Sequence, residues 1–141
     1  MKTISSRISL LSLAALLGLP FAAQARFSSR IELTAVSQDL QNNVIYDVST
    51  TSTISGAAGQ AALRVPAGGI VAINVKPGVT LTVTGGDGNG ASGAGPGILV
   101  PANSKLYLLG GGEIIARGGN AGNGSSGGDG GSGGTDRKSV V

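Results

Sequence analysis

Apolar residues recur at every second position along four segments of the 141-residue chain, which is the period of β-strands. The segments read RIELTAV, VIYDV, IVAINV and VTLTVT, and in each one every second side chain is apolar. The tripeptide KPG at residues 76–78 suits a type II turn, because glycine stands where such a turn needs a positive φ. The polar stretch STTSTIS at residues 49–55 is either a further strand or a connector. The pattern therefore predicts short strands joined by sharp turns, and it contains no helical signal.

Two segments, VKPGVTLTVTGG (75–86) and VPANSKLYLLGG (100–111), share one pattern of apolar residues and closing glycines at an offset of 25 residues. This offset aligns Ile73 with Ile98, Val75 with Val100, Leu81 with Leu106, and Val83 with Leu108. A period of roughly 20–50 residues is typical of solenoids, in which equivalent side chains of successive coils stack about 4.8 Å apart. The tripeptide VPA, which begins at Val65 and again at Val100, offers an alternative offset of 35 residues.

These patterns predict an all-β fold, the start of a right-handed β-solenoid (β-helix) with short strands and glycine-rich loops. A β-sandwich with accidental internal similarity is the alternative. We assign residues 26–60 to an N-terminal β cap segment and residues 61–117 to solenoid coils with a repeat of about 25 residues. Because repeat folds generally need three or more units, we expect the chain to be the truncated start of a longer array.

The segment 118–135 has a period of its own. It parses into triplets in which the first two residues are small and the third is polar. A period of three residues is that of polyproline II, and a disordered Gly/Ser linker is the alternative interpretation.

The N-terminus has the three parts of a secretory signal peptide, which we assign to residues 1–25. Lys2 and Arg7 supply the positive region, residues 8–19 are apolar, and Ala23 and Ala25 are the small residues at the cleavage positions. We therefore expect cleavage before Arg26 and a mature protein that is secreted, or lies on the outer membrane or cell surface, after passing through the periplasm. An apolar region of twelve residues is too short to span a bilayer, which needs about 20.

The last six residues, DRKSVV (136–141), depart abruptly from the glycine-rich pattern. They resemble a sequencing adapter translated in frame, and a short basic tail is the alternative. Between residues 26 and 135 six positive and six negative side chains balance, so the net charge of +3 comes from the signal peptide and the tail. The basic balance of the whole chain therefore gives no support to nucleic acid as a partner.

Composition excludes several chemistries. The chain has no Cys, His or Trp, which removes disulfides, the usual zinc and copper ligands, and the commonest general base. The glycine motif of calcium-binding repeats needs an Asp where GGDGNGASG has Gly90 and where GGDGGSGGT has Ser132. We expect no cofactor, no metal site and no enzymatic activity.

Two arrangements of polar residues are candidate sites. Thr80, Thr82 and Thr84 form one rung of the Thr-x-Thr type found in ice-binding solenoids, but the 25-residue offset places Lys105, Tyr107 and Leu109 on the next rung and breaks the ladder. Asp87 and Glu113 stand 26 residues apart, so stacking could bring together two carboxylates of the kind used in glycoside hydrolysis. Solvated charges at the coil corners are the simpler interpretation.

A signal peptide, a short β segment and V-P-x-x-x-x-L-x-L-x-G-x-G units followed by glycine-rich tails resemble the N-terminal passenger region of bacterial autotransporter-type, adhesin-like surface proteins. Residues 100–122 carry the resemblance, and residues 75–97 carry it more weakly. The resemblance implies a β-helical passenger, export to the outer membrane and adhesion to glycans or proteins of a host or cell surface. The alternative function is the N-terminal fragment of a β-helix polysaccharide-active enzyme.

Overall fold

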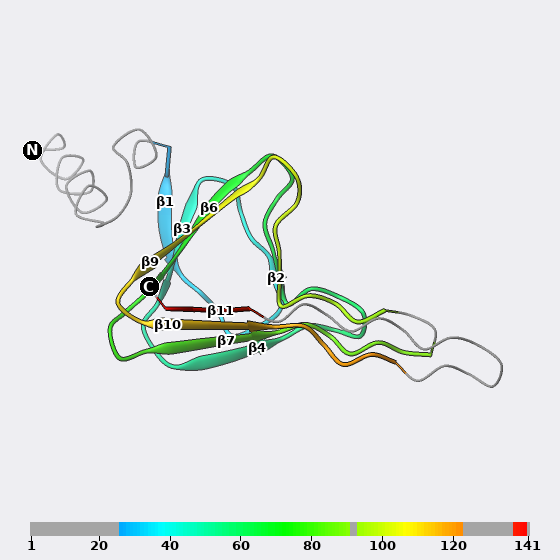
Figure 1. The fold of residues 1–141 in the computed structure, drawn as a ribbon. Helices are drawn as coiled ribbons and strands as arrows, with labels where there is room; N and C mark the ends of the chain where they lie inside the picture. Colours follow the sequence, from blue (N-terminus) through cyan, green and yellow to red (C-terminus); the bar gives the residue numbers. More distant parts are fainter. Residues whose placement is uncertain (1–25, 91–92, 123–136, 141) are drawn as a thin grey trace, which may run out of the picture.

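The computed structural model describes residues 26–90, 93–122 and 137–140, which contain β-strands, turns and loops but no helix (Figure 1). Sheet A consists of β1 (Ser29–Glu32), β3 (Val44–Val48), β6 (Ile70–Val75) and β9 (Lys105–Gly110), in this spatial order. Sheet B consists of β2 (Gln38–Asp39), β5 (Leu63–Arg64) and β8 (Ile98–Leu99). Sheet C consists of β4 (Ser52–Ser55), β7 (Thr80–Thr84), β10 (Glu113–Arg117) and β11 (Arg137–Val140).

The chain passes through sheets B, A and C in a fixed order. It does so three times, along β2–β3–β4, β5–β6–β7 and β8–β9–β10, and the equivalent strands of successive circuits pair in parallel. Figure 1 shows the three sheets as the sides of a triangle. The predicted all-β fold is therefore confirmed, with parallel sheets, and the stretch around residue 52 is a strand, β4.

The interior of the triangle is filled by the apolar residues of the alternating segments. In sheet A, Tyr46 lies opposite Ile73, and Ile73 lies opposite Leu108. Tyr46 is buried, and its hydroxyl accepts a hydrogen bond from the backbone N–H of Gln41 at 2.8 Å. The one polar atom of this buried side chain therefore has a partner. Each fully buried Val, Leu or Ile contributes about 1.5–3 kcal/mol through the hydrophobic effect.

The 25-residue register is wrong. Leu81 of β7 lies opposite Ile114 of β10, whereas Leu106 of β9 lies opposite Val71 of β6, so the two leucines that the offset aligned belong to different sheets. The alternative offset of 35 residues holds between the second and third circuits in sheets A and B, for example between Leu63 and Ile98. The 25-residue offset aligned β7 with β9 because both strands alternate and both end near glycines. Every strand has a two-residue period, so this pattern does not distinguish strands of one sheet from strands of another.

The turns follow the local sequence. Val79 N–H donates to the carbonyl of Lys76 at 3.1 Å and Gly78 has a φ of 76°, so the turn predicted for KPG is present. The turn that begins at Pro66 has Gly68 at a φ of 67°, and the equivalent turn 35 residues later has Asn103 at 62°. Asparagine is the residue that best replaces glycine at a positive φ.

The two ends of the stack of circuits differ. At the N-terminal end the chain leaves β1 in sheet A and begins β2 in sheet B without a strand in sheet C, and Leu33 of this connection belongs to the interior cluster. At the other end Ile98, Leu106 and Leu108 are only half-buried, and Leu99 and Val100 are 37% and 43% exposed. There β11 pairs with β10 and is the antiparallel neighbour of an otherwise parallel sheet.

Candidate functional site

The outer face of sheet C carries rows of hydroxyl groups. Leu81 and Val83 point into the core, so the alternate residues of β7 lie on the outer face. Thr53 lies opposite Thr82, and Ser55 lies opposite Thr84. The N–H of Thr80 donates to the hydroxyl of Thr51 at 3.1 Å, which ties the beginning of this face together.

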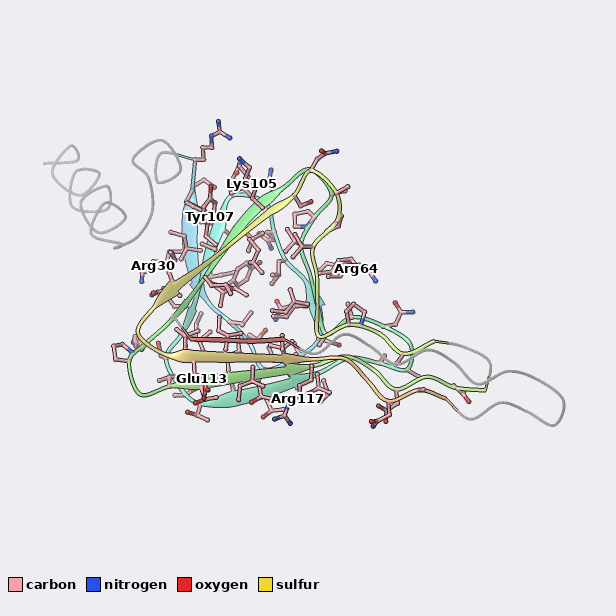
Figure 2. The ribbon with its side chains drawn as sticks, in the orientation of Figure 1. Arg30, Arg64, Lys105, Tyr107, Glu113 and Arg117 are labelled. Atoms are coloured by element: carbon pink, nitrogen blue, oxygen red, sulfur yellow. The ribbon has the colours of Figure 1, made fainter. Side chains whose placement is uncertain are left out.

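The register corrects the neighbours that the sequence suggested for the Thr-x-Thr rung. Instead of Lys105, Tyr107 and Leu109, which belong to β9 in sheet A, the rung on the third circuit is Glu113, Ile115 and Arg117. The hydroxyl ladder therefore extends from the second circuit back to the first and ends at the third. Figure 2 shows Glu113 and Arg117 on the outer side of sheet C. The face offers uncharged hydroxyls over two circuits, bordered by one acidic and one basic side chain.

The outer face of sheet A carries a charged network over its first three strands. Arg30 of β1 forms an ion pair with Asp47 of β3 through two of its guanidinium nitrogens, and the Nη2–Oδ1 bond is 2.6 Å long. Asn74 of β6 donates its amide N–H to the same Oδ1 at 2.7 Å. Sequence reasoning missed this network, because its members stand 17 and 27 residues apart and only the strand register brings them together.

The network shifts the pKa values of Arg30 and Asp47. Burial acts to raise the pKa of Asp47, but hydrogen bonds from Arg30 and Asn74 and the charges of Arg30 and Lys76 outweigh it and lower that pKa below its ordinary value. The hydrogen bond to Asp47 raises the pKa of Arg30 against the opposing effect of burial. The ion pair is thus charged on both sides at neutral pH. Together with Asn74 it links β1, β3 and β6.

An apolar patch lies beside this network on the same face. Phe27 is 4% exposed and packs edge-to-face on Tyr107 of β9, with ring centroids 6.2 Å apart. Ile45 and Ala72, from the two strands between them, are 1% and 0% exposed and belong to the same cluster. Phe27 therefore ties the N-terminus to the third circuit across the whole sheet. Figure 2 shows Tyr107 on this outer side.

The chain forms a glycine-rich corner beyond the ends of β4, β7 and β10, made of residues 56–60, 85–90, 93–97 and 118–122. Its backbone hydrogen bonds recur every third residue: Gly56 and Gly59 donate to Thr84 and Asp87, and Gly85 and Gly88 donate to Arg117 and Asn120. Figure 1 shows these segments running side by side away from the sheets. The stacking of circuits thus continues into the loops with a three-residue period.

Glycine is required at the centre of this corner because the layers approach so closely. A Cβ on Gly86 would lie 1.6 Å from the carbonyl oxygen of Ala57, and one on Gly119 would lie 2.2 Å from that of Gly86. Real Cβ atoms do not come this near to a backbone oxygen. Of the triplet segment predicted over residues 118–135, only residues 118–122 are described, and its polyproline II conformation stays a prediction.

Asp87 and Glu113, the candidate pair for glycoside hydrolysis, do not lie together in the structure. Glu113 begins β10 opposite Thr80, whereas Asp87 follows the end of β7 in the glycine-rich corner. Asp87 accepts hydrogen bonds from the N–H and side-chain amide of Asn120, at 2.7 and 3.1 Å. Over residues 26–90, 93–122 and 137–140, no three acidic, His or Cys side chains form a group that could hold a metal ion.

The predicted signal-cleavage residues lie at the edge of what the structure describes. Ala23 and Ala25 fall outside the described residues, and Arg26 is exposed immediately before the buried Phe27. Within the described part of the chain, no helix has the length and apolar character needed to cross a membrane. Comparison of the chain with protein-family models, curated proteins and solved structures gives no match.

Proposed function

We propose that the chain is the N-terminal part of a secreted or surface-exposed structural repeat protein, a right-handed β-solenoid of the adhesin or autotransporter-passenger type. The observation that carries the proposal is the passage of the chain through the same three parallel sheets on successive circuits around one apolar interior. Parallel strands of one sheet joined by a crossover are right-handed in about 98% of cases, which supports the handedness.

The difference between the two ends supports a longer array. Val71 and Ile73 of the second circuit are fully buried, whereas their neighbours in the third circuit, Leu106 and Leu108, are half-buried. A further circuit would cover these leucines and remove their apolar surface from water, at about 25 cal/mol per Å². At the N-terminal end, Leu33 already covers the interior. We propose that the array continues beyond the third circuit in the C-terminal direction, and that a strand of the next circuit takes the place that β11 has beside β10.

A structural role also agrees with how the polar groups are used. The ionised pair of Arg30 and Asp47 binds strands together, and Asp87 binds the glycine layers together. The outer face of sheet C is the surface we propose for contact with glycans or proteins, because its hydroxyls on two circuits can donate and accept hydrogen bonds without a charge to desolvate.

Export and surface display are tested with the intact gene, expressed in a Gram-negative host with an epitope tag after residue 135. The proposal expects N-terminal sequencing to find Arg26 first, and protease added to whole cells to remove the tag. A product that stays in the cytoplasm with residues 1–25 attached would overturn the exported role.

Binding is tested separately, by glycan-array and cell-adhesion assays with the exported protein. Replacing Thr82 with Asp on the outer face of sheet C should reduce binding, while the same change at Ser28, outside this face, should not. Equal binding by both variants would remove sheet C as the contact surface. Release of reducing sugars from a polysaccharide would favour the enzyme instead.

A further inference from the structure

Two dipeptides in the glycine-rich corner have the sequence required for succinimide chemistry, Asp87-Gly88 and Asn89-Gly90. In this reaction the backbone nitrogen of the glycine attacks the side-chain carbonyl carbon of the preceding residue. For Asn, a C–N bond forms to Cγ, the bond from Cγ to Nδ2 breaks, and ammonia leaves with the proton of the glycine N–H. Water then opens the five-membered ring to Asp or to isoaspartate. Glycine favours the step because it has no Cβ and adopts the necessary φ and ψ readily.

We propose that Asn89 is a site of spontaneous deamidation and that the fold protects its neighbour Asp87. The Asn89 side chain is exposed, and none of the hydrogen bonds among the described residues involves its amide or the N–H of Gly90. Gly90 has a φ of 59°, and a Cβ built on it would have no atom within 4 Å. Within the part of the chain that the structure describes, no hydrogen bond therefore holds the attacking nitrogen or the amide that it attacks.

Asp87-Gly88, two residues earlier, is held in place at both reacting groups. Its Oδ1 accepts two hydrogen bonds from Asn120, and the N–H of Gly88 donates to the Asn120 carbonyl at 2.8 Å. Attack on Cγ would break all three bonds. A carboxylate is also a poorer electrophile than an amide.

Deamidation changes the electrostatics of the corner. It replaces a neutral amide by a carboxylate two residues from Asp87, and in the isoaspartyl product it lengthens the backbone by one methylene. The corner is closely packed on its inner side, where a Cβ on Gly122 would meet the backbone nitrogen of Asn89 at 3.0 Å. The added charge and atom are therefore accommodated on the solvent side. This inference is independent of the proposed function.

The experiment incubates the full chain at mildly alkaline pH and follows each Asn by peptide mapping with fragmentation that separates Asp from isoaspartate. A synthetic peptide of residues 86–93 is the unfolded reference. Asn89 should convert at a rate closer to that of the peptide than any other described Asn, because neither its side-chain amide nor the N–H of Gly90 has a hydrogen bond among the described residues that must break first. Asn120 and Asn74, whose amides are hydrogen-bonded, should convert far more slowly.

Two variants sharpen the test. N89Q should abolish the fast conversion, since the longer side chain forms the ring poorly. N120A removes only the side-chain hydrogen bond to Asp87 and keeps both backbone bonds of residue 120, so it should leave the conversion of Asn89 unchanged and Asp87 protected. Conversion of Asn89 as slow as that of Asn74, or an unchanged product at residues 86–93 in N89Q, would overturn the proposal.

Discussion

Thr82 of β7 and Ile115 of β10 lie opposite each other on the outer face of sheet C. The 25-residue offset would instead place Tyr107 beside Thr82, and Tyr107 belongs to sheet A. Because the chain contains no cysteine, engineered cysteine pairs can distinguish the two registers. Paired parallel strands hold Cα atoms within the range of about 4.4–6.8 Å that a disulfide needs.

We expect the double variant Thr82→Cys/Ile115→Cys to form an intramolecular disulfide on mild oxidation, measured by thiol titration and mass spectrometry. Thr82→Cys/Tyr107→Cys is the matched control and should retain two free thiols. The opposite result would restore the 25-residue register and remove the three-sheet arrangement.

The local features of this fold could be predicted from the sequence, and the long-range ones could not. Alternation in VTLTVT identified β7, and KPG identified its preceding turn, because both depend on neighbouring residues alone. The register depends on circuit length, which is 27 residues from Val44 to Val71 but 35 from Val71 to Leu106. The glycine-rich segment after β7 lengthens the chain between equivalent strands, so no single period describes it.

The neighbours of each candidate site residue depend on the same register. The Thr80–Thr84 rung was recognised, but its neighbours were wrong because they follow from the register. The pair of Arg30 and Asp47 carries no local signal at all. With the register known, opposite charges on neighbouring strands would have been enough to find it.

Acid should remove part of the stability through Asp47. Its pKa is lowered in the folded state, so its ionised form contributes stability that is complete above the ordinary value of 3.8 and is lost as the pH falls through the lowered folded value. At neutral pH, Asp47→Asn should cost about 1.5–3 kcal/mol, the range for a hydrogen bond to a charged group. Urea unfolding of both proteins, followed by circular dichroism, measures the difference.

The gap between wild type and Asp47→Asn should narrow below pH 3.8, where the unfolded carboxyl is already protonated. Asp39→Asn is the control, because Asp39 lies 3.8 Å from Arg64 and its side chain is 80% exposed. If the gap at Asp47 does not depend on pH, the ion pair makes no contribution.

The glycine-rich corner should tolerate a methyl group only where the layers leave room. Gly86→Ala should destabilise the protein by about 3 kcal/mol or more, since the added Cβ meets the Ala57 carbonyl oxygen and the backbone must move. Gly111→Ala is the matched control. Neither glycine has a positive φ, and the Cβ at Gly111 would meet the Pro77 side chain at 3.2 Å. We expect a loss of about 0.5 kcal/mol or less there. Equal effects in thermal unfolding would contradict the close packing of the layers.

The apolar patch on sheet A makes the N-terminal residues part of the fold. Phe27→Ala should cost about 3 kcal/mol, because it uncovers Ile45 and Ala72 and removes the ring that packs on Tyr107. Ile31→Ala, at a side chain that is 42% exposed, should cost less than about 1 kcal/mol. A double-mutant cycle between Phe27→Ala and Tyr107→Ala should give a coupling of about 0.5–1.5 kcal/mol, typical of an edge-to-face pair. Additive losses would mean that the two rings act independently, and the N-terminus would then not be anchored to the third circuit.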